Sequence, residues 1–494
     1  MTGDDRRPRP GAEEQRRLLA VGLSRADLTA EQLWRRYFAL GGLEGPVEVR
    51  EHLDGGTPLP AAETDLLAHA VNERLDEISG RRVPYRLAVR EPPPRSGPLA
   101  ALVEALEGSH RAPPERLPAV AEAAGRALGV EVSVFLVDYD QEALVPAAGG
   151  REPLGIDSSA AGRAFSRVQV LTSGSSGAPR MWFPLLDGVE RLGVVEVAVD
   201  DPADLDDPHL RDQCRWLSAL LGHLITATTR YGDGLDVLRR STRRTAAAEL
   251  VWELLPPLTA GTDAFVLAGL LEPAYEVGGD AFDYALSGTT AHLAVFDATG
   301  HSLFSGLVAA AALSAYRAAR RGGEGLYHQA AAIDETVGDL FGRTTRLVTG
   351  VLAEVDLASG RMRYVTAGHP PPMLMRDGRV VRSLEGGRRP LFGIAAAAAS
   401  APAAARTEEL TVGEEVLQPG DWLVLHTDGI TEARDATGAF FGEERLVEFL
   451  QREAAADAPP PETVRRLVRA VLRHQDGVLQ DDATIVLARW SPVP

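Results

Sequence analysis

Lysine is absent from the sequence, so all 51 cationic side chains are arginine. This absence excludes the P-loop lysine, the kinase strand lysine and Schiff-base chemistry. The single cysteine, Cys214, cannot form an intramolecular disulfide or a thiolate metal cage, which favours a reducing compartment. No run approaches the ~20 uncharged apolar residues that span a bilayer, and the N-terminus lacks the apolar core of a signal peptide. We therefore expect a cytoplasmic protein that is neither secreted nor inserted in a membrane.

Basic side chains are also fewer than acidic ones. The 70 acidic side chains outnumber the 51 arginines and give a formal net charge of −19. Nucleic-acid binders present a basic patch or stripe, so this balance argues against a nucleic-acid partner. A chain of 494 residues that is 45% hydrophobic is instead typical of a globular protein with two or three domains.

The first segment, residues 1–92, is expected to form a small helical unit. Apolar residues recur at helical spacing in LTAEQLWRRYFAL (28–40) and AAETDLLAHAVNERLDEI (61–78). Thr29 and Gln32 have the spacing of a capping box in the first of these helices. The consecutive prolines of REPPPRSGP then end the unit, because they interrupt both helices and sheets.

The second segment, residues 97–230, is expected to be an α/β domain. The motifs AAGRAF (160–165) and WFPLLDGVERLGVVEV (182–197) make it resemble a GAF sensory domain. The resemblance implies a regulatory role and an unidentified small-molecule ligand. A connecting helix is expected over residues 231–257, because apolar residues fall at i+4 spacing there and two prolines stop the helix.

The third segment, residues 258–494, alternates apolar strands with two blocks of paired helices (305–341 and 443–475). This order predicts two packed sheets flanked by helices, an α+β domain with α-β-β-α layers. The apolar strands are AFVLAGLL, AHLAVFD, LVTGVLAEVD, RMRYVTA, DWLVLHTD and ATIVLARW.

Carboxylates mark the ends of several of these strands. Asp297 ends AHLAVFD, and Asp428 ends DWLVLHTD. Asp481 and Asp482 precede the strand ATIVLARW, and Asp280 lies in VGGD between two strands. If the last strand runs antiparallel to the other two, its beginning and their ends meet at one rim of the sheet. Each residue alone is typical of a strand-end turn, but four carboxylates at one rim repel each other and need a cation.

A pair of divalent cations would neutralise such a cluster. Ligation by oxygen alone selects hard ions, Mg²⁺ or Mn²⁺, over zinc or copper. Two such ions ~3.5–4 Å apart activate a water and hold both oxygens of an in-line displacement, which is the chemistry of phosphoester hydrolysis. This mechanism requires no side-chain nucleophile.

Six motifs in this half of the chain resemble, in order, those of the PPM-type metal-dependent serine/threonine phosphatases. The similar subgroup is the one named for the stage II sporulation protein E, and the resemblance spans roughly residues 245–492. The motifs are EPAYEVGGDAFDYAL, VFDATGHSLFSGLVAAA, VTAGHPPPMLMRDG, LVLHTDGITEARD, FGEERL and DDATIVL.

The resemblance implies a role for each matching residue. Asp297 would bridge two metal ions, with the carbonyl oxygen of Ala298 helping on one side. Asp280 would bind that same ion, while Asp428 and Asp481 would bind the other. Asp297 and Asp428 are the expected catalytic residues.

Some positions depart from the family pattern or leave its roles open. Asp482 either supports Asp481 or, with a register slip of one, is itself the ligand. Ser302 stands where the family usually has glycine, and Thr366 stands where asparagine is common, so rate and specificity are in question. His301 could act as a general acid or cap the following helix, and we favour the cap. His369 is expected to stabilise a turn.

These observations predict a metal-dependent protein serine/threonine phosphatase regulated by its upstream GAF-like domain. In similar proteins the substrate is a phosphorylated anti-sigma factor antagonist, and the working unit here could be a homodimer. The alternative is a catalytically impaired phosphatase-like sensor or partner-binding regulator. The four carboxylates favour the enzyme, because a degenerate site is expected to lose them first.

Overall fold

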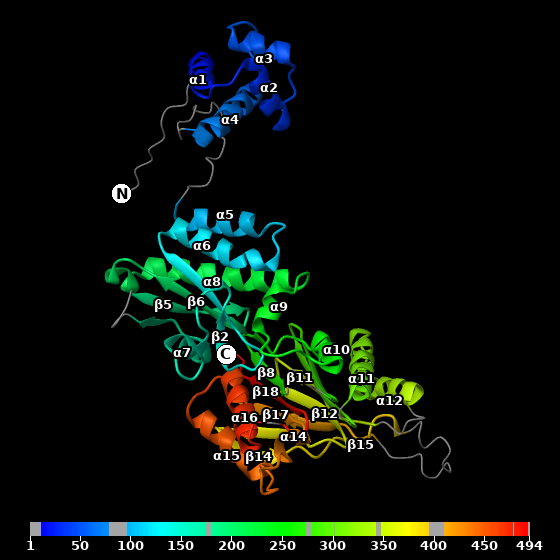
Figure 1. Cartoon of the computed structure of the whole chain (residues 1–494). Helices are drawn as coiled ribbons and strands as arrows, with labels where there is room; N and C mark the ends of the chain where they lie inside the picture. Colours follow the sequence, from blue (N-terminus) through cyan, green and yellow to red (C-terminus); the bar gives the residue numbers. More distant parts are fainter. Residues whose placement is uncertain are drawn as a thin grey trace. The chain divides into compact units, whose positions relative to one another are not determined.

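The computed structural model describes residues 11–78, 96–173, 179–272, 278–300, 302–341, 347–394, 410–477 and 479–492. The chain forms two compact units, Met1–Pro93 and Pro94–Pro494 (Figure 1). None of the helices in these ranges combines the length and apolarity that crossing a bilayer demands. His301 lies outside the described residues.

The N-terminal unit is helical, as the sequence predicts. Thr29 and Gln32 form the expected capping box, in which Gln32 N–H donates to Thr29 Oγ1 and Thr29 N–H donates to the Gln32 side chain. Its core consists of leucine, alanine and valine side chains and one tyrosine, among them Leu19, Tyr37 and Leu67. The helices are α1 (Ala12–Arg25), α2 (Ala30–Ala39), α3 (Pro46–Leu53) and α4 (Ala61–Ile78).

The second unit begins with an upstream domain built on one sheet of six strands, in the order β3-β2-β1-β6-β5-β4. Alternate side chains of the strands pack on α5, α6 and α8 on one face and on α7 on the other. The strands are β1 (Glu131–Val137), β2 (Ala143–Pro146), β3 (Leu154–Gly155), β4 (Leu171–Ser173), β5 (Arg180–Asp187) and β6 (Glu190–Ala198). The helices are α5 (Pro98–Ser109), α6 (Leu117–Leu128), α7 (Ala160–Arg167) and α8 (Pro208–Thr229), with short 3₁₀ turns at Pro114–Arg116 and Pro202–Asp206.

The single connecting helix predicted over residues 231–257 is wrong. The structure has two short helices there, α9 (Gly234–Arg239) and α10 (Ala246–Leu254). Arg240 leaves the helical conformation and pairs with both Asp236 and Glu249. Thr245 then starts α10 by accepting the N–H of Ala248. These polar contacts outweigh the apolar periodicity that suggested a continuous helix.

The C-terminal domain, residues 258–492, contains two further six-stranded sheets. The first has the order β15-β12-β11-β10-β9, with β16 paired to β12, and the second has the order β14-β13-β17-β18-β8-β7. The first eight strands are β7 (Thr259–Thr262), β8 (Phe265–Glu272), β9 (Asp280–Leu286), β10 (Thr290–Ala298), β11 (Val348–Asp356), β12 (Arg361–Ala367), β13 (Met373–Arg376) and β14 (Arg379–Ser383). The others are β15 (Arg388–Arg389), β16 (Gly413–Val416), β17 (Trp422–His426) and β18 (Ala483–Trp490).

Helices cover the outer faces of these two sheets (Figure 1). Helices α11 (Leu303–Arg321) and α12 (Leu326–Phe341) pack on the first sheet, and α15 (Gly442–Ala455) and α16 (Pro460–His474) pack on the second. Between the sheets, side chains from both inner faces share one apolar core, including Phe282, Val295 and Leu425.

The two sheets correct one expectation about the carboxylate-bearing strands. The sequence suggested that the strands ending at Asp297 and Asp428 belong to one sheet. Instead β10 lies in the first sheet, and β17 pairs with β18 in the second. β18 does run antiparallel to β17, so the start of one strand and the end of the other meet at one rim.

Helix α16 connects the C-terminal domain to the upstream domain. Its Arg465 is fully buried and donates to Glu462 on the same helix, to Asp157 and to the carbonyl oxygen of Gln141. Arg191 of β6 donates to Glu462 at 3.3 Å and to the carbonyl oxygen of Pro461. Because α16 also packs on β8 and β18, it holds the sheet that carries Asp481 against the upstream domain.

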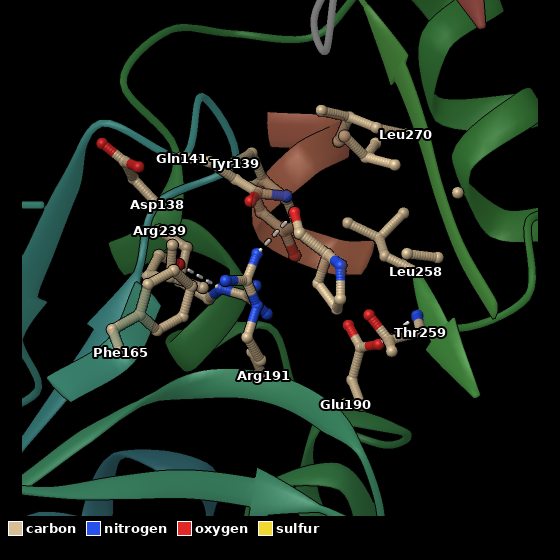
Figure 2. Close-up of a pocket in the computed structure, with 15 residues that line it drawn as sticks. Asp138, Tyr139, Gln141, Phe165, Glu190, Arg191, Arg239, Leu258, Thr259 and Leu270 are labelled. Carbon is tan, nitrogen blue, oxygen red and sulfur yellow. Dashed lines mark hydrogen bonds between the residues drawn. The ribbon is translucent and has the colours of Figure 1, made fainter. Parts of the chain in front are cut away.

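The interface encloses a cavity of about 20 Å³, shown in Figure 2. Arg191 stacks on the ring of Phe165, 4.4 Å from its centroid, and the carboxylate of Glu190 accepts the N–H of Thr259. Burial raises the pKa of Glu190 to about 7. A cavity of this size holds about one water, so it is too small for the ligand expected of a sensory domain.

Candidate active site

Asp280 and Asp297 are direct cross-strand neighbours on β9 and β10. Asp280 is only 2% exposed, and its carboxylate accepts a hydrogen bond of 2.7 Å from the hydroxyl of Thr427 on the facing sheet. The same hydroxyl accepts the N–H of Thr484 at 2.9 Å. Thr427 therefore joins the rims of the two sheets next to Asp428.

Asp428 begins the short helix α14 (Asp428–Thr431), directly after β17. The residue after Asp428 has to be glycine for a steric reason. A Cβ atom at Gly429 would lie 1.8 Å from the carbonyl oxygen of Asp482, so only glycine lets the two chain segments approach this closely. This contact places Asp428 beside the start of β18.

Asp481 and Asp482 have different surroundings, although they are adjacent. The carboxylate of Asp482 is buried and accepts the backbone N–H groups of Gly278, Gly279 and Asp280, the shortest at 2.6 Å. Asp481 is exposed, and one of its oxygens accepts the N–H of Asp482. Asp482 thus holds the backbone of Gly278, Gly279 and Asp280 in place, whereas the side chain of Asp481 stays at the surface.

The carbonyl oxygen of Ala298 lies against this same segment. Ala298 N–H donates to the carbonyl oxygen of Gly279 at 3.0 Å, and a Cβ atom at Gly279 would lie 2.1 Å from the carbonyl oxygen of Ala298. Glycine is therefore needed at this position because the Ala298 carbonyl oxygen occupies the space that a Cβ atom would take.

The carboxylates at this rim raise one another's pKa values. Burial, with the charges of Asp297 and Asp482, raises the pKa of Asp280 well above its usual value. Burial and the charges of Asp428, Asp481 and Asp482 raise the pKa of Asp297 to about 7. The pKa of Asp428 is raised by burial and by Asp481. Concentrated negative charge of this kind is stabilised by a bound cation.

The donor chemistry of the rim fits oxygen-ligated divalent cations. Four carboxylates and one backbone carbonyl reach it from both sheets, and hard cations such as Mg²⁺ and Mn²⁺ prefer these ligands. In the described part of the chain, no three acidic, histidine or cysteine side chains stand at metal-ligating spacing. The fit of the rim to a divalent cation therefore rests on the identity of the donor groups and on their mutual repulsion. The carboxylate side chains have to move closer to one another to bind an ion.

Sequence reasoning missed the threonines that orient these carboxylates. Thr349 lies opposite Asp297 on β11, and its hydroxyl lies 3.4 Å from the Asp297 carboxylate and 2.8 Å from Nδ1 of His369. Burial lowers the pKa of His369 to about 3, so this histidine is neutral. Thr427 is the second such residue. The threonine directly before the aspartate in HTDG could have indicated it, whereas Thr349 carries no comparable local signal.

Comparisons with known proteins concern the C-terminal half of the chain. Residues 287–491 match the family model described as Stage II sporulation protein E (SpoIIE). Protein IcfG from Synechocystis sp. is 29% identical over 133 residues, which are 27% of this chain. This chain spans about a fifth of the length of that relative, 19%.

Two solved structures are similar at low sequence identity. The SiaA-PP2C domain of Pseudomonas aeruginosa shares 22% identity and a TM-score of 0.42, covering 54% of this chain and 99% of that one. The RsbU and RsbW domains of Rv1364c from Mycobacterium tuberculosis share 24% identity and a TM-score of 0.39, covering 48% of this chain and 63% of that one. By the match to the family model, residues 287–491 of the C-terminal domain are similar to the Stage II sporulation protein E (SpoIIE) family.

Proposed function

We propose that this chain is a metal-dependent phosphatase that hydrolyses phosphoserine or phosphothreonine on a regulatory protein. The observation that carries the proposal is the meeting of Asp280, Asp297, Asp428 and Asp481 from two facing sheets at one rim. Water attacks the phosphorus, the bond from phosphorus to the serine or threonine oxygen breaks, and the products are the free hydroxyl and phosphate.

The proposed metal ligands divide into two sets. Asp297 would bridge two ions, with Asp280 and the carbonyl oxygen of Ala298 on one side and Asp428 and Asp481 on the other. Bound Mg²⁺ or Mn²⁺ supplies Lewis-acid activation of water and charge neutralisation at the phosphate. Asp297 and Asp428 are the proposed catalytic residues because they would touch these ions.

The remaining residues of the rim hold the ligands in position. Thr427 donates to Asp280, Thr349 lies within hydrogen-bonding reach of Asp297, and Asp482 fixes the backbone next to Asp280. Such fixed partners orient ligands and limit their reorganisation when charge develops in the reaction.

The substrate and the regulation are inferred by resemblance. We propose a phosphorylated anti-sigma factor antagonist as the partner, a GAF-like sensory role for residues 97–230 with a small-molecule ligand, a cytoplasmic location and a possible homodimer. A catalytically impaired sensor or partner-binding regulator is the competing function. The intact carboxylates and their supporting hydrogen bonds favour the enzyme, because a non-catalytic protein has no need to bury repelling charges.

Metal dependence is the direct test. Purified full-length protein should hydrolyse p-nitrophenyl phosphate and phosphoserine peptides with added Mn²⁺ or Mg²⁺, because the cations neutralise the carboxylates that otherwise repel the phosphate. Hydrolysis should stop with a chelator and return when metal is restored. Full turnover after exhaustive chelation contradicts the metal centre, and no turnover under any metal supports the impaired regulator.

Ser302→Gly tests the departure from the family pattern. Ser302 has φ −149° and ψ 172° before α11, an extended conformation that any residue adopts, so glycine offers no relief of strain. Its N–H donates to the Ser305 hydroxyl, a bond that glycine keeps. We expect kcat for p-nitrophenyl phosphate to stay within about twofold and stability to fall by only a few tenths of a kcal/mol, as for glycine at other helix starts. A tenfold loss of kcat shows that the hydroxyl contacts the substrate.

A further inference from the structure

One short loop of the upstream domain contacts two separate helices beyond that domain. The loop connects β1 to β2, and we call its residues 138–142 the β1–β2 loop. Its shape is fixed from within, because the carboxylate of Asp138 accepts the N–H of Glu142 at 2.8 Å and the N–H of Ala143 at 3.1 Å. A loop held in this way passes the position of the upstream sheet on to the elements that it touches.

The first contact of the β1–β2 loop is with the segment that leads into α10. The ring of Tyr139 lies between two guanidinium groups, with its centroid 4.5 Å from that of Arg239 and 4.1 Å from that of Arg244. The same ring packs edge-on against Trp252 of α10, with centroids 5.7 Å apart. Cation–π and edge-to-face contacts are attractive at these separations. Tyr139 therefore fixes α10 relative to the upstream sheet.

The second contact of the β1–β2 loop is with α16. The carbonyl oxygen of Gln141 accepts a hydrogen bond of 3.2 Å from Arg465, and the carboxylate of Glu142 accepts one of 2.5 Å from Arg469. Helix α16 packs on β18, the strand that Asp481 precedes. The loop therefore also holds the helix behind one of the proposed metal ligands.

Helix α10 reaches the other side of the proposed metal centre. It packs on α11, where a Cβ atom at Gly306 would lie 3.6 Å from Ala247 of α10 and 3.6 Å from the carbonyl oxygen of Gly278. The three segments thus meet with no more room between them than one methyl group takes. Gly278 stands two residues before Asp280, and its N–H donates to Asp482. A shift of α10 would therefore press on the backbone that carries Asp280.

We propose that Tyr139 is a positioning residue for the metal centre, because its ring holds α10 in a fixed place relative to the β1–β2 loop and, through that loop, to α16. The proposal rests on the proposed phosphatase function and assigns part of the support of the metal ligands to the upstream domain. The ligands come from two sheets, so fixing the helices behind those sheets keeps Asp280 and Asp481 at the spacing that two cations need. The upstream domain then contributes to catalysis by direct support, in addition to any sensory role.

Mn²⁺ affinity of the full-length protein, measured by calorimetry, tests the proposal without relying on turnover. Tyr139→Leu should weaken Mn²⁺ binding about fivefold, an effect typical of substitutions in a packed network behind a site. Tyr139→Phe keeps the ring and loses only the hydroxyl, which donates to Asp236, so its affinity should stay within about twofold of wild type. Wild-type affinity in Tyr139→Leu overturns the proposal, as does an equal loss in Tyr139→Phe, which would assign the effect to the hydroxyl.

Leu221→Ala is the control for a general loss of stability. Leu221 lies on α8, is fully buried in the core of the upstream domain and is not part of the β1–β2 loop. Its truncation leaves a cavity, so the thermal midpoint should fall while Mn²⁺ affinity remains that of the wild type. If Leu221→Ala weakens Mn²⁺ binding as much as Tyr139→Leu does, the effect belongs to any destabilised upstream domain and the proposal is overturned.

Substitutions of Trp252 test the same contact from the side of α10. If the contact between the two rings carries the effect, Tyr139→Leu should weaken Mn²⁺ binding no further in a Trp252→Leu background, because the contact is already lost there. A full additional fivefold loss in the double variant overturns the proposal. Where Tyr139→Leu does not fold, Trp252→Leu is compared with Trp252→Phe, which keeps an aromatic ring, and equal Mn²⁺ affinities of these two variants overturn the proposal.

Failure of the phosphatase function has a separate signature. If the wild-type protein binds no Mn²⁺, the proposed metal centre is wrong, and the role of Tyr139 is rejected with it. If the wild-type protein binds Mn²⁺ and Tyr139→Leu binds it equally well, the proposed function stands and only the role of Tyr139 is rejected.

Discussion

Asp297→Asn should lower kcat at least about a thousandfold, which corresponds to about 4 kcal/mol of transition-state stabilisation. The side chain lies among Asp428, Asp481 and Asp482, whose charges together with burial raise its pKa to about 7. Asparagine removes the charge that would bridge two cations, so Mn²⁺ affinity measured by calorimetry should fall together with kcat. Near-wild-type turnover would remove Asp297 from the set of ligands.

The same substitution should leave the folded state intact. Without metal the Asp297 carboxylate repels its neighbours, so its neutral replacement relieves repulsion, and the thermal midpoint in chelator should be unchanged or raised. Asp421→Asn provides the matched control. Asp421 is also an aspartate and is buried, but it accepts hydrogen bonds from Arg376 and from Gln418 N–H. Its loss should cost about 1.5–3 kcal/mol of stability with little change in kcat.

The local part of the site could be predicted from sequence. Apolar strands that end in Asp297 and Asp428, and a pair of acids before the last strand, indicate carboxylates at strand ends whatever the fold. The glycines of VGGD and the glycine after Asp428 are turn signals in the sequence, and the structure gives their reason. Gly279 and Gly429 each allow a backbone approach that a Cβ atom would block.

The distribution of these strands between two sheets could not be predicted. The strands that end at Asp297 and Asp428 are equally apolar, because each is buried on both faces, and pairing partners lie far apart in sequence. Thr427 and Thr349 were missed for the same reason. A threonine at the end of a strand is common, and only the facing sheet or the adjacent strand shows that its hydroxyl meets a carboxylate.

The contact between the domains was missed because charged residues on an amphipathic helix are normally exposed. In α16 the apolar stripe packs on β8 and β18, and a sequence analysis assigns Glu462 and Arg465 to the solvent side. The upstream domain instead covers them. The break between α9 and α10 has a similar cause, since Arg240 forms ion pairs with residues on either side of it.

Arg465→Ala should lower the free energy of unfolding by about 3 kcal/mol, the largest stability effect expected for a single residue of this interface. The side chain of Glu462 is 2% exposed and that of Arg465 is 1% exposed, so the substitution leaves a buried carboxylate with fewer partners. Burial acts to raise the pKa of Glu462, but the hydrogen bond and charge of Arg465 outweigh burial, so the pKa is lowered. The pair therefore stabilises the protein at pH values above the usual glutamate pKa. This stabilisation is lost as the pH falls and Glu462 is protonated.

Arg466→Ala is the matched control for this measurement. Arg466 is the next residue on the helix and also donates to Glu462, at 2.7 Å, but its side chain is 44% exposed. Solvent screens an ion pair of this kind, so its loss should cost less than about 1 kcal/mol. Urea unfolding of the full-length variants at pH 7 compares the two. If both substitutions destabilise the protein equally, Arg465 is hydrated in solution and α16 is not held to the upstream domain by this residue. If Arg465→Ala lowers the free energy of unfolding by about 2 kcal/mol or more beyond Arg466→Ala, Arg465 is the residue that holds α16 to the upstream domain.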